Sequence, residues 1–280
     1  MIMANSFLNN ISKGIAHQLS TIKKNLYNSD YGLNIYSIKY LKHLPKGEQT
    51  RNIDFKYGRI YYRSAVDLYH SLEELFGDKI YKQELKENSY ILDCGSNIGL
   101  SAIYLKSICP TATIELFEPD SKNFELLSKN VASCNLQNVV LHNKAIWKEN
   151  TTLHFQNRGT LASRIDTSAE AEGTKVEAIR LRDFMTREID FLKIDIEGAE
   201  YPVVKDIEDK LYLVKNFFLE YHGKFEENDQ LAELLDIVKR NGFSFYIREA
   251  GLVYKTPFYR PDDGIERIYD VQLNIFCFRK

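Results

Sequence analysis

The chain has 280 residues, of which 44% are hydrophobic and 27% charged, with a formal net charge of -2. A chain of this length can bury one sizeable core and carry a smaller appendage. A nearly neutral net charge without an obvious basic cluster provides no positive electrostatic field for binding nucleic acid, so we expect no nucleic-acid partner. The four cysteines lack the spacing of a zinc site, which favours a reduced, cytoplasmic protein.

The N-terminal region is tyrosine-rich and is expected to be helical to about residue 50. We expect no signal peptide here, and no transmembrane segment in the chain. The first 25 residues are expected to dock on their own domain, with weak peripheral membrane contact as the alternative. A hairpin around Tyr57-Gly58 and a helix over residues 68–76 follow. We therefore expect a helical and hairpin extension, residues 1–88, that covers a cleft or makes a homodimer.

Residues 89–280 form the second expected domain, in which short apolar strands alternate with amphipathic helices. Strands are expected at residues 90–93, 113–118, 139–142, 190–195 and 217–220. The last two, residues 243–247 and 273–278, are joined by a loop alone and should pair antiparallel. This order predicts an α/β fold, a Rossmann-like doubly wound, mostly parallel seven-stranded sheet with one antiparallel strand. The stretch 151–182 interrupts the alternation and is expected to be an inserted hairpin or flap.

The turn after the first of these strands, Asp93–Gly99, has the composition of a ligand-binding turn. Gly95 and Gly99 allow a tight turn and a close approach of backbone to a ligand. The side chain of Asn97 can offer an amide to a neighbouring carboxylate. A diphosphate needs bare backbone amides at a helix N-terminus, and Asp93 would repel it. The acid suits the cationic sulfonium and ammonium groups of S-adenosylmethionine better.

Two more strand ends should face the same ligand, because ligands of doubly wound sheets bind outside the carboxyl ends of the strands. Glu118 follows the second strand, where a carboxylate can accept both hydroxyls of a ribose. The alternative is that Glu118 caps the next helix or faces solvent. The segment Asn143–Ile146, including Ala145, stands where side chains usually flank an adenine.

Five segments together resemble the FkbM family of class I S-adenosylmethionine-dependent methyltransferases. They are Ile91–Gly99, Phe117–Pro119, Asn143–Ile146, Phe191–Glu200 and Leu219–His222. The resemblance covers roughly residues 68–222. It implies the class I fold, S-adenosylmethionine as the methyl donor, and O-methylation of a hydroxyl on a sugar, a polyketide or a related molecule.

The ends of the fourth and fifth strands carry the candidate catalytic residues. Asp195, Glu197 and Glu200 follow the fourth strand, although acids in a first helical turn also suit the helix dipole. An aliphatic hydroxyl is a poor nucleophile until its proton has an acceptor. His222 titrates near neutrality. We therefore expect Asp195 or His222 to be the base, with Glu197 and Glu220 orienting the substrate.

Several assignments at these strand ends have alternatives. No metal is required, but Asp195, Glu197 and Glu220 offer the hard oxygen ligands that Mg²⁺ prefers. Lys193 either pairs with one of these acids or binds an acidic substrate. Ser163-Arg164, in the interrupting stretch, is a candidate for closing over the acceptor.

The sequence is compatible with four functions to different degrees. The leading one is an O-methyltransferase acting on a small-molecule or glycan acceptor, that is, a sugar or a natural-product intermediate. An N-methyltransferase acting on an amine or amino sugar would need the base less. A nicotinamide-binding oxidoreductase is disfavoured by the lack of a Gly-x-Gly-x-x-Gly turn. A non-catalytic adaptor is disfavoured by the intact set of acids at the strand ends.

Overall fold

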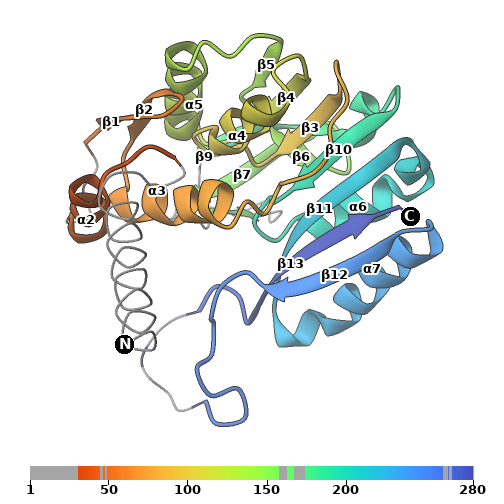
Figure 1. The fold of residues 1–280 in the computed structure, drawn as a ribbon. Coiled ribbons are helices and arrows are strands. Elements are labelled where there is room, and N and C mark those ends of the chain that lie inside the picture. Colours follow the sequence, from red (N-terminus) through yellow and green to blue (C-terminus); the bar gives the residue numbers. More distant parts are fainter. Residues whose placement is uncertain are drawn as a thin grey trace, which may run out of the picture. The chain divides into compact units, whose positions relative to one another are not determined.

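The computed structural model describes residues 31–44, 47, 49–157, 163–166, 174–260, 264 and 267–279 (Figure 1). The expected helix within the first 25 residues lies outside this part of the chain. Two compact units are present. The first includes the chain up to Lys82 together with Ala132–Asn135, and the second includes Gln83–Val131 and Leu136–Lys280.

The first unit contains the expected hairpin and helix. Its elements in chain order are α2 (Ile35–His43), β1 (Arg51–Phe55), β2 (Gly58–Tyr62), α3 (Ala65–Leu72) and the π-helical turn η1 (Glu73–Gly77). Asn34 and Ser64 begin the two α-helices as N-caps, since their side chains accept the amides of Ser37 and Asp67. The buried face of α3 presents Leu68 and Leu72.

The second unit is built on a seven-stranded sheet, as the sequence predicts. Its strands are β3 (Tyr90–Cys94), β4 (Thr113–Phe117), β5 (Val139–His142), β10 (Ile189–Ile194), β11 (Val214–Gly223), β12 (Ser244–Glu249) and β13 (Val271–Phe278). They lie in the order β12-β13-β11-β10-β3-β4-β5. Only β13 runs against its neighbours among these seven, pairing antiparallel with β11 and β12. The predicted Rossmann-like fold is confirmed.

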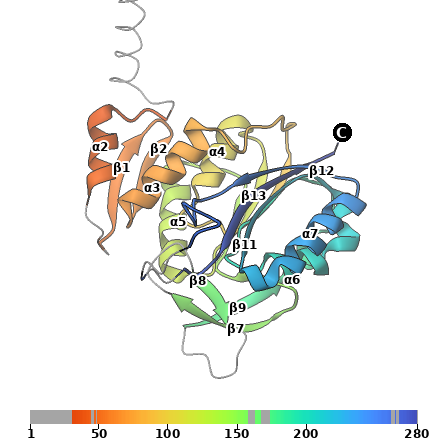
Figure 2. The same ribbon diagram turned by 90° about the horizontal axis from the view of Figure 1, so that it is seen from below.

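Helices cover both faces of this sheet. They are α4 (Leu100–Ile108), α5 (Ser121–Ser133), α6 (Glu200–Asp206) and α7 (Asn228–Arg240), with single turns η2 (Leu181–Phe184), η3 (Glu208–Leu213) and η4 (Phe225–Glu227) between elements. Figure 2 shows α6 and α7 on one face and α4 on the other. Every residue of β3 is buried, as expected for a central parallel strand. Among the described residues, no helix combines the length and the apolar character that crossing a membrane requires.

The stretch expected to be a hairpin or flap belongs to a second sheet of four strands. These are β6 (Ala145–Trp147), β7 (Thr151–Asn157), β8 (Ser163–Asp166) and β9 (Thr174–Arg180), in the order β6-β9-β7-β8. The antiparallel pairs β7–β8 and β7–β9 are hairpin-like, but β6 pairs parallel with β9. The hairpin prediction was incomplete because that parallel pair joins segments distant in sequence. The side chains of Ser163 and Arg164 lie outside the described part.

The order of the large sheet reverses between β3 and β10. From β3 the chain continues to β4 and β5 on one side, and it later places β10 and β11 on the other. Ligands of open α/β sheets bind outside the carboxyl ends of the strands at such a reversal. The functional side chains are therefore expected at the carboxyl ends of β3, β4, β10 and β11 (Figure 1).

Candidate active site

The turn after β3 uses its backbone amides within the protein. The amides of Gly95 and Ser96 both donate to the carbonyl oxygen of Phe117, each at 2.9 Å. The amide of Asn97 donates to Oε2 of Glu118 at 2.8 Å. A pyrophosphate site needs amides that point at the ligand. Because these three are already engaged, the turn does not resemble a dinucleotide-binding loop.

The two glycines of the turn are required by the packing of the chain. Gly95 has a φ of +82°, and a Cβ there would lie 1.7 Å from the carbonyl oxygen of Asp195. Gly99 has a φ of +87°, and its Cβ would lie 2.5 Å from Cδ1 of Leu127. Gly95 therefore excludes a side chain through contact with backbone, whereas at Gly99 the left-handed backbone is the main reason for glycine, since the end of the Leu127 side chain can shift. The close approach expected toward a ligand is occupied here by the protein itself.

A buried ammonium group joins the ends of β3 and β10. Nζ of Lys193 lies 3.4 Å from Oδ1 of Asp93 and 3.2 Å from Oδ2 of Asp195, and donates to the carbonyl oxygen of Gly95 at 2.7 Å. Burial alone would lower the pKa of Lys193, but the two carboxylates raise it above its ordinary value. Asp93 is fully buried and also accepts a hydrogen bond from Ser101. Of the two roles left open for Lys193, the structure shows ion pairing.

Glu118 follows β4 and closes the turn from the neighbouring strand. Its carboxylate accepts the amide of Asn97 through one oxygen and that of Asp120 through the other, at 2.8 and 2.9 Å. Burial raises the pKa of Glu118 to about 7. A carboxylate has about four acceptor positions, so two remain for further donors. Glu118 thus combines a fixed orientation with acceptor capacity.

The segment expected to flank an adenine divides into two parts. The side-chain amide of Asn143 donates to the carbonyl oxygens of Glu118 and Pro119, at 2.9 and 3.2 Å, and so ties the end of β5 to that of β4. Ala145 begins β6, and its side chain is buried in the core of the four-stranded sheet with Leu153. Asn143 is therefore the residue of this segment that lies at the strand ends.

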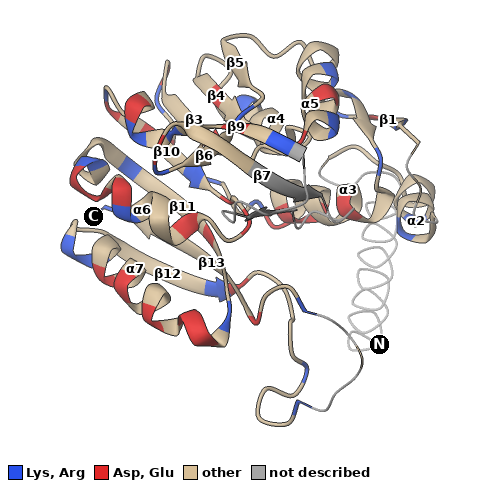
Figure 3. Cartoon of the chain, turned by 180° about the vertical axis from the view of Figure 1, so that it is seen from behind, with Lys and Arg blue, Asp and Glu red and all other residues tan. Residues whose placement is uncertain are grey.

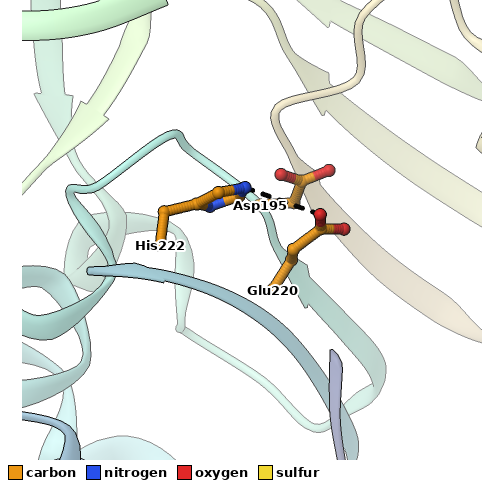
Figure 4. A group of neighbouring side chains, drawn as sticks. All are labelled: Asp195, Glu220 and His222. Atoms are coloured by element: carbon orange, nitrogen blue, oxygen red, sulfur yellow. Dashed lines mark ion pairs between the residues drawn. The ribbon is translucent and has the colours of Figure 1, made fainter. Parts of the chain in front are cut away.

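A second group of polar side chains lies at the ends of β10 and β11. Asp195, Glu220 and His222 each offer a ligand atom, and these atoms lie within 4.8 Å of one another (Figure 4). Glu220 and His222 belong to β11 itself, which continues to Gly223, beyond the predicted end. The strand is longer because β13 pairs with it as far as Gly223. Two residues apart on one strand, both side chains lie on the same face.

The imidazole of His222 is enclosed by carboxylates. The residue is 5% exposed, and Nδ1 lies 3.2 Å from Oε1 of Glu200. Nε2 lies 3.5 Å from Glu220 and 3.7 Å from Glu197. Burial by itself would lower the pKa of His222, but Glu200, Glu220 and Glu197 raise it well above its ordinary value. Both ring nitrogens face carboxylates, which is an unusual setting for a free base.

The loop after β10 holds this group in place through Glu200, the first residue of α6. Glu200 is 1% exposed and accepts the amide of Gly198 with both oxygens, at 3.0 Å, and that of Ile196 at 3.2 Å. Its role therefore exceeds a favourable helix dipole, since it fixes the loop and the imidazole of His222 together. Burial raises the pKa of the neighbouring Glu197 to about 8.

Tyr269 is a member of the site that sequence reasoning missed. Its hydroxyl donates to the carbonyl oxygen of Glu197 at 2.8 Å, and its ring centre lies 4.9 Å from that of His222. It also lies against Gly198, whose φ is +94°. Tyr269 comes from the loop before β13, which carries no motif, so only the spatial pairing of β13 with β11 reveals it.

Comparisons with known proteins find methyltransferases. The model of the methyltransferase FkbM domain matches residues 93–245. "Methyltransferase 1" of Beauveria bassiana is 27% identical over 53% of this chain and 71% of its own length, and "Methyltransferase sdnD" of Sordaria araneosa is 28% identical over 62% and 82%. The crystal structure of methyltransferase FkbM from Methylobacillus flagellatus has a TM-score of 0.48 at 15% identity, covering 86% of this chain and 58% of that one. The family match spans more than half of the 280 residues. The chain therefore belongs to the FkbM family of methyltransferases.

Proposed function

We propose that this methyltransferase transfers a methyl group from S-adenosylmethionine to a hydroxyl oxygen of a small-molecule or glycan acceptor, such as a sugar or a natural-product intermediate. One observation carries the proposal. At the reversal of the sheet, Glu118 stands beside the turn after β3, and Asp195, Glu220 and His222 lie together one strand away. The first set suits a nucleoside donor, and the second suits a hydroxyl acceptor.

The residues around the turn fit S-adenosylmethionine. Glu118 has acceptor capacity for two ribose hydroxyls, and its two backbone hydrogen bonds hold the carboxylate in one orientation. Asp93 is buried behind the turn and supports it through its contacts with Lys193 and Ser101. When bound, S-adenosylmethionine supplies an electrophilic methyl group on a cationic sulfur, which an acid-rich edge favours over an anionic ligand.

The acceptor needs positioning and a place for its proton. In the displacement, the hydroxyl oxygen bonds to the methyl carbon while the carbon–sulfur bond breaks, and the hydroxyl proton passes to a carboxylate. Asp195 and Glu197 are the candidates, with side chains 26% and 22% exposed. His222 is better suited to orienting these carboxylates, because both of its ring nitrogens already face acids.

The charge distribution supports an uncharged hydroxyl acceptor. Lys and Arg alternate with Asp and Glu over the described elements, with acids prominent along α7 (Figure 3). This mixture favours no nucleic-acid acceptor. An amine placed among Asp195, Glu197 and Glu220 would be held as an ammonium ion, which has no lone pair for attack. The four cysteines are free, which is consistent with a cytoplasmic enzyme.

The test separates donor binding from transfer. Calorimetry measures S-adenosylmethionine binding, and a labelled methyl group is followed into matched hydroxyl and amine acceptors of a sugar panel. Asp195→Asn should keep the donor affinity within about twofold and lower transfer by about 10²–10⁴-fold. The exposed Asp229→Asn in α7 is the matched control and should change neither. Labelling of the amine acceptors alone, or full transfer by Asp195→Asn and Glu197→Gln alike, would contradict the proposal.

A further inference from the structure

We infer that Asp195, Glu220 and His222 form a binding site for one divalent cation, of which Mn²⁺ fits the ligand set best. The three donors come from the ends of two adjacent parallel strands, β10 and β11. The binding site stands on this geometry, whereas its use in catalysis rests on the proposed function.

The spacing of the donors fits a single ion. Ligand atoms lie about 2.0–2.2 Å from a small divalent ion, so two of them are separated by roughly 3–4.4 Å around it. The three candidate atoms lie within 4.8 Å of one another before any ion draws them together. Figure 4 shows a ring nitrogen of His222 directed toward the carboxylates of Glu220 and Asp195. A small rotation of these side chains would bring all three into coordination distance.

The partner of His222 on its other ring nitrogen is a second, independent observation. A metal-binding histidine almost always donates its remaining N–H to a carboxylate, carbonyl or water, which fixes its orientation. Nδ1 of His222 lies 3.2 Å from Glu200, and Glu200 is in turn fixed by the amides of Ile196 and Gly198. A bound cation would displace the proton from Nε2, whose lone pair would then face the ion while Nδ1 keeps its hydrogen bond to Glu200. A carboxylate–histidine pair of this kind orients a ligand.

The charges at this edge leave room for a cation. Four carboxyl groups, those of Asp195, Glu197, Glu200 and Glu220, face two cationic side chains, those of His222 and Lys193. Lys193 is shared with a fifth carboxylate, that of Asp93. Like charges in a partly buried setting repel strongly, and they are retained where a cation joins them. A divalent ion would convert this repulsion into coordination.

The mixture of oxygen and nitrogen ligand atoms determines which ion fits the site. Ca²⁺ and Mg²⁺ prefer oxygen ligands throughout, whereas imidazole nitrogen favours first-row transition metals. Two carboxylates and one imidazole suit Mn²⁺, which accepts both donor types, and they leave coordination positions open. Those positions would take two neighbouring oxygens of the acceptor, as a vicinal diol of a sugar presents. With Asp195 as a ligand, the hydroxyl proton would pass to Glu197, which is not one of the three.

The experiment titrates Mn²⁺ into the chelator-treated full chain and follows the free ion by its paramagnetic resonance signal. The wild type should bind one ion, and Glu220→Gln should weaken that binding at least tenfold. Glu200→Gln should weaken it about 10–100-fold, because it removes the charged partner of the histidine and weakens the hold on the loop after β10. Glu125→Gln, an exposed acid in α5, makes the same chemical change away from the site and should bind as the wild type does. Excess Ca²⁺ should not displace the ion.

Donor binding is measured on the same samples, so that each failure has one meaning. Equal Mn²⁺ binding by the wild type, Glu220→Gln and Asp195→Asn would overturn the cation site, as would a wild type that binds none. Retained S-adenosylmethionine binding by a variant shows that its fold is intact. Full methyl transfer in the presence of chelator would overturn the catalytic use of the ion and leave the proposed function standing. If the protein bound Mn²⁺ but not S-adenosylmethionine, the proposed function would be overturned and the cation site would stand.

Discussion

The turn after β3 and the loop after β10 are neighbours with similar backbones and different supports. Each places a non-glycine residue at positive φ, Asn97 at 48° and Glu197 at 56°, with a left-handed glycine close behind. The amides of the first turn donate mainly to a backbone carbonyl, that of Phe117. The amides of the second donate to the side chain of Glu200. The side proposed to bind the donor is thus set by backbone, and the side proposed to bind the acceptor is set by side chains.

This difference makes the turn after β3 insensitive to most side-chain changes and the loop after β10 sensitive to them. A turn held by main-chain hydrogen bonds needs glycines and few particular side chains, so it can serve any acceptor chemistry. A loop held by one buried carboxylate brings charge into the site, and substitutions there change the charge as well as the shape. Lys193 contacts both sides, through Asp93 and Asp195. Variants at this junction have the largest expected effects.

Lys193→Met should give the largest loss of stability. It leaves the fully buried carboxylate of Asp93, and the partly exposed one of Asp195, without their cation, which costs about 3–5 kcal/mol of the free energy of unfolding. Lys215→Met on the adjacent β11 is the matched control, since Lys215 also pairs with two acids, Glu188 and Asp190, but is partly exposed. It should cost about 1 kcal/mol or less. Urea denaturation measures both, and equal losses would show that Lys193 does not join the two sides.

Gly95→Ala tests whether the donor turn is packed directly against the acceptor loop. The added Cβ meets the carbonyl oxygen of Asp195 at 1.7 Å, so the turn or the loop must move. We expect a loss of about 2–4 kcal/mol from overpacking together with left-handed strain. Gly264→Ala separates the two contributions, because Gly264 has a φ of +68° but no atom within 4 Å of an added Cβ. If thermal unfolding shows the same loss for both variants, the contact with Asp195 is unimportant.

The donor side could largely be predicted from the sequence, and the acceptor side only in part. Asp93 lies near the end of β3, and Gly95 and Glu118 directly follow β3 and β4, so strand periodicity and short motifs predict that they lie at these strand ends. The mostly parallel sheet with one antiparallel strand followed from the same alternation. For Lys193, pairing with an acid such as Asp195 was one of two alternatives, but its second partner, Asp93, was not predicted, because it is 100 residues away in the sequence and an ion pair leaves no local pattern.

The remaining differences have the same physical origin. The length of β11, and with it the position of His222, depends on pairing with β13. The second sheet depends on the parallel pairing of Ala145 with Ala178, and no short-range signal marks that register. Tyr269 reaches the site through the loop before β13. Tertiary partners, rather than propensities, decided each of these features.

Glu118→Gln should weaken donor binding while leaving the acceptor side unchanged. The neutral amide removes the charge that accepts the ribose hydroxyls, and a hydrogen bond to a charged group contributes about 1.5–3 kcal/mol, so we expect at least about a tenfold loss of affinity for S-adenosylmethionine. Asp120→Asn is the matched control, because Asp120 accepts the amide of Asn123 and asparagine can do the same. Calorimetry with the donor checks both. An unchanged affinity in Glu118→Gln would remove Glu118 from the donor site.

The smallest expected effect is a pH dependence confined to the donor side. Burial raises the pKa of Glu118 to about 7 from the ordinary value of 4.5, and the ionised form is the better acceptor for ribose hydroxyls. Affinity for S-adenosylmethionine should therefore fall as the pH falls from 8 to 6, by up to about tenfold. Stability without the donor should change in the opposite direction. Because the folded pKa lies above the unfolded one, the contribution of Glu118 to stability is complete below pH 4.5 and is lost as the pH rises through about 7. In Glu118→Gln the contribution of this residue to both trends should disappear, and a wild-type affinity independent of pH between 6 and 8 would place the ribose elsewhere.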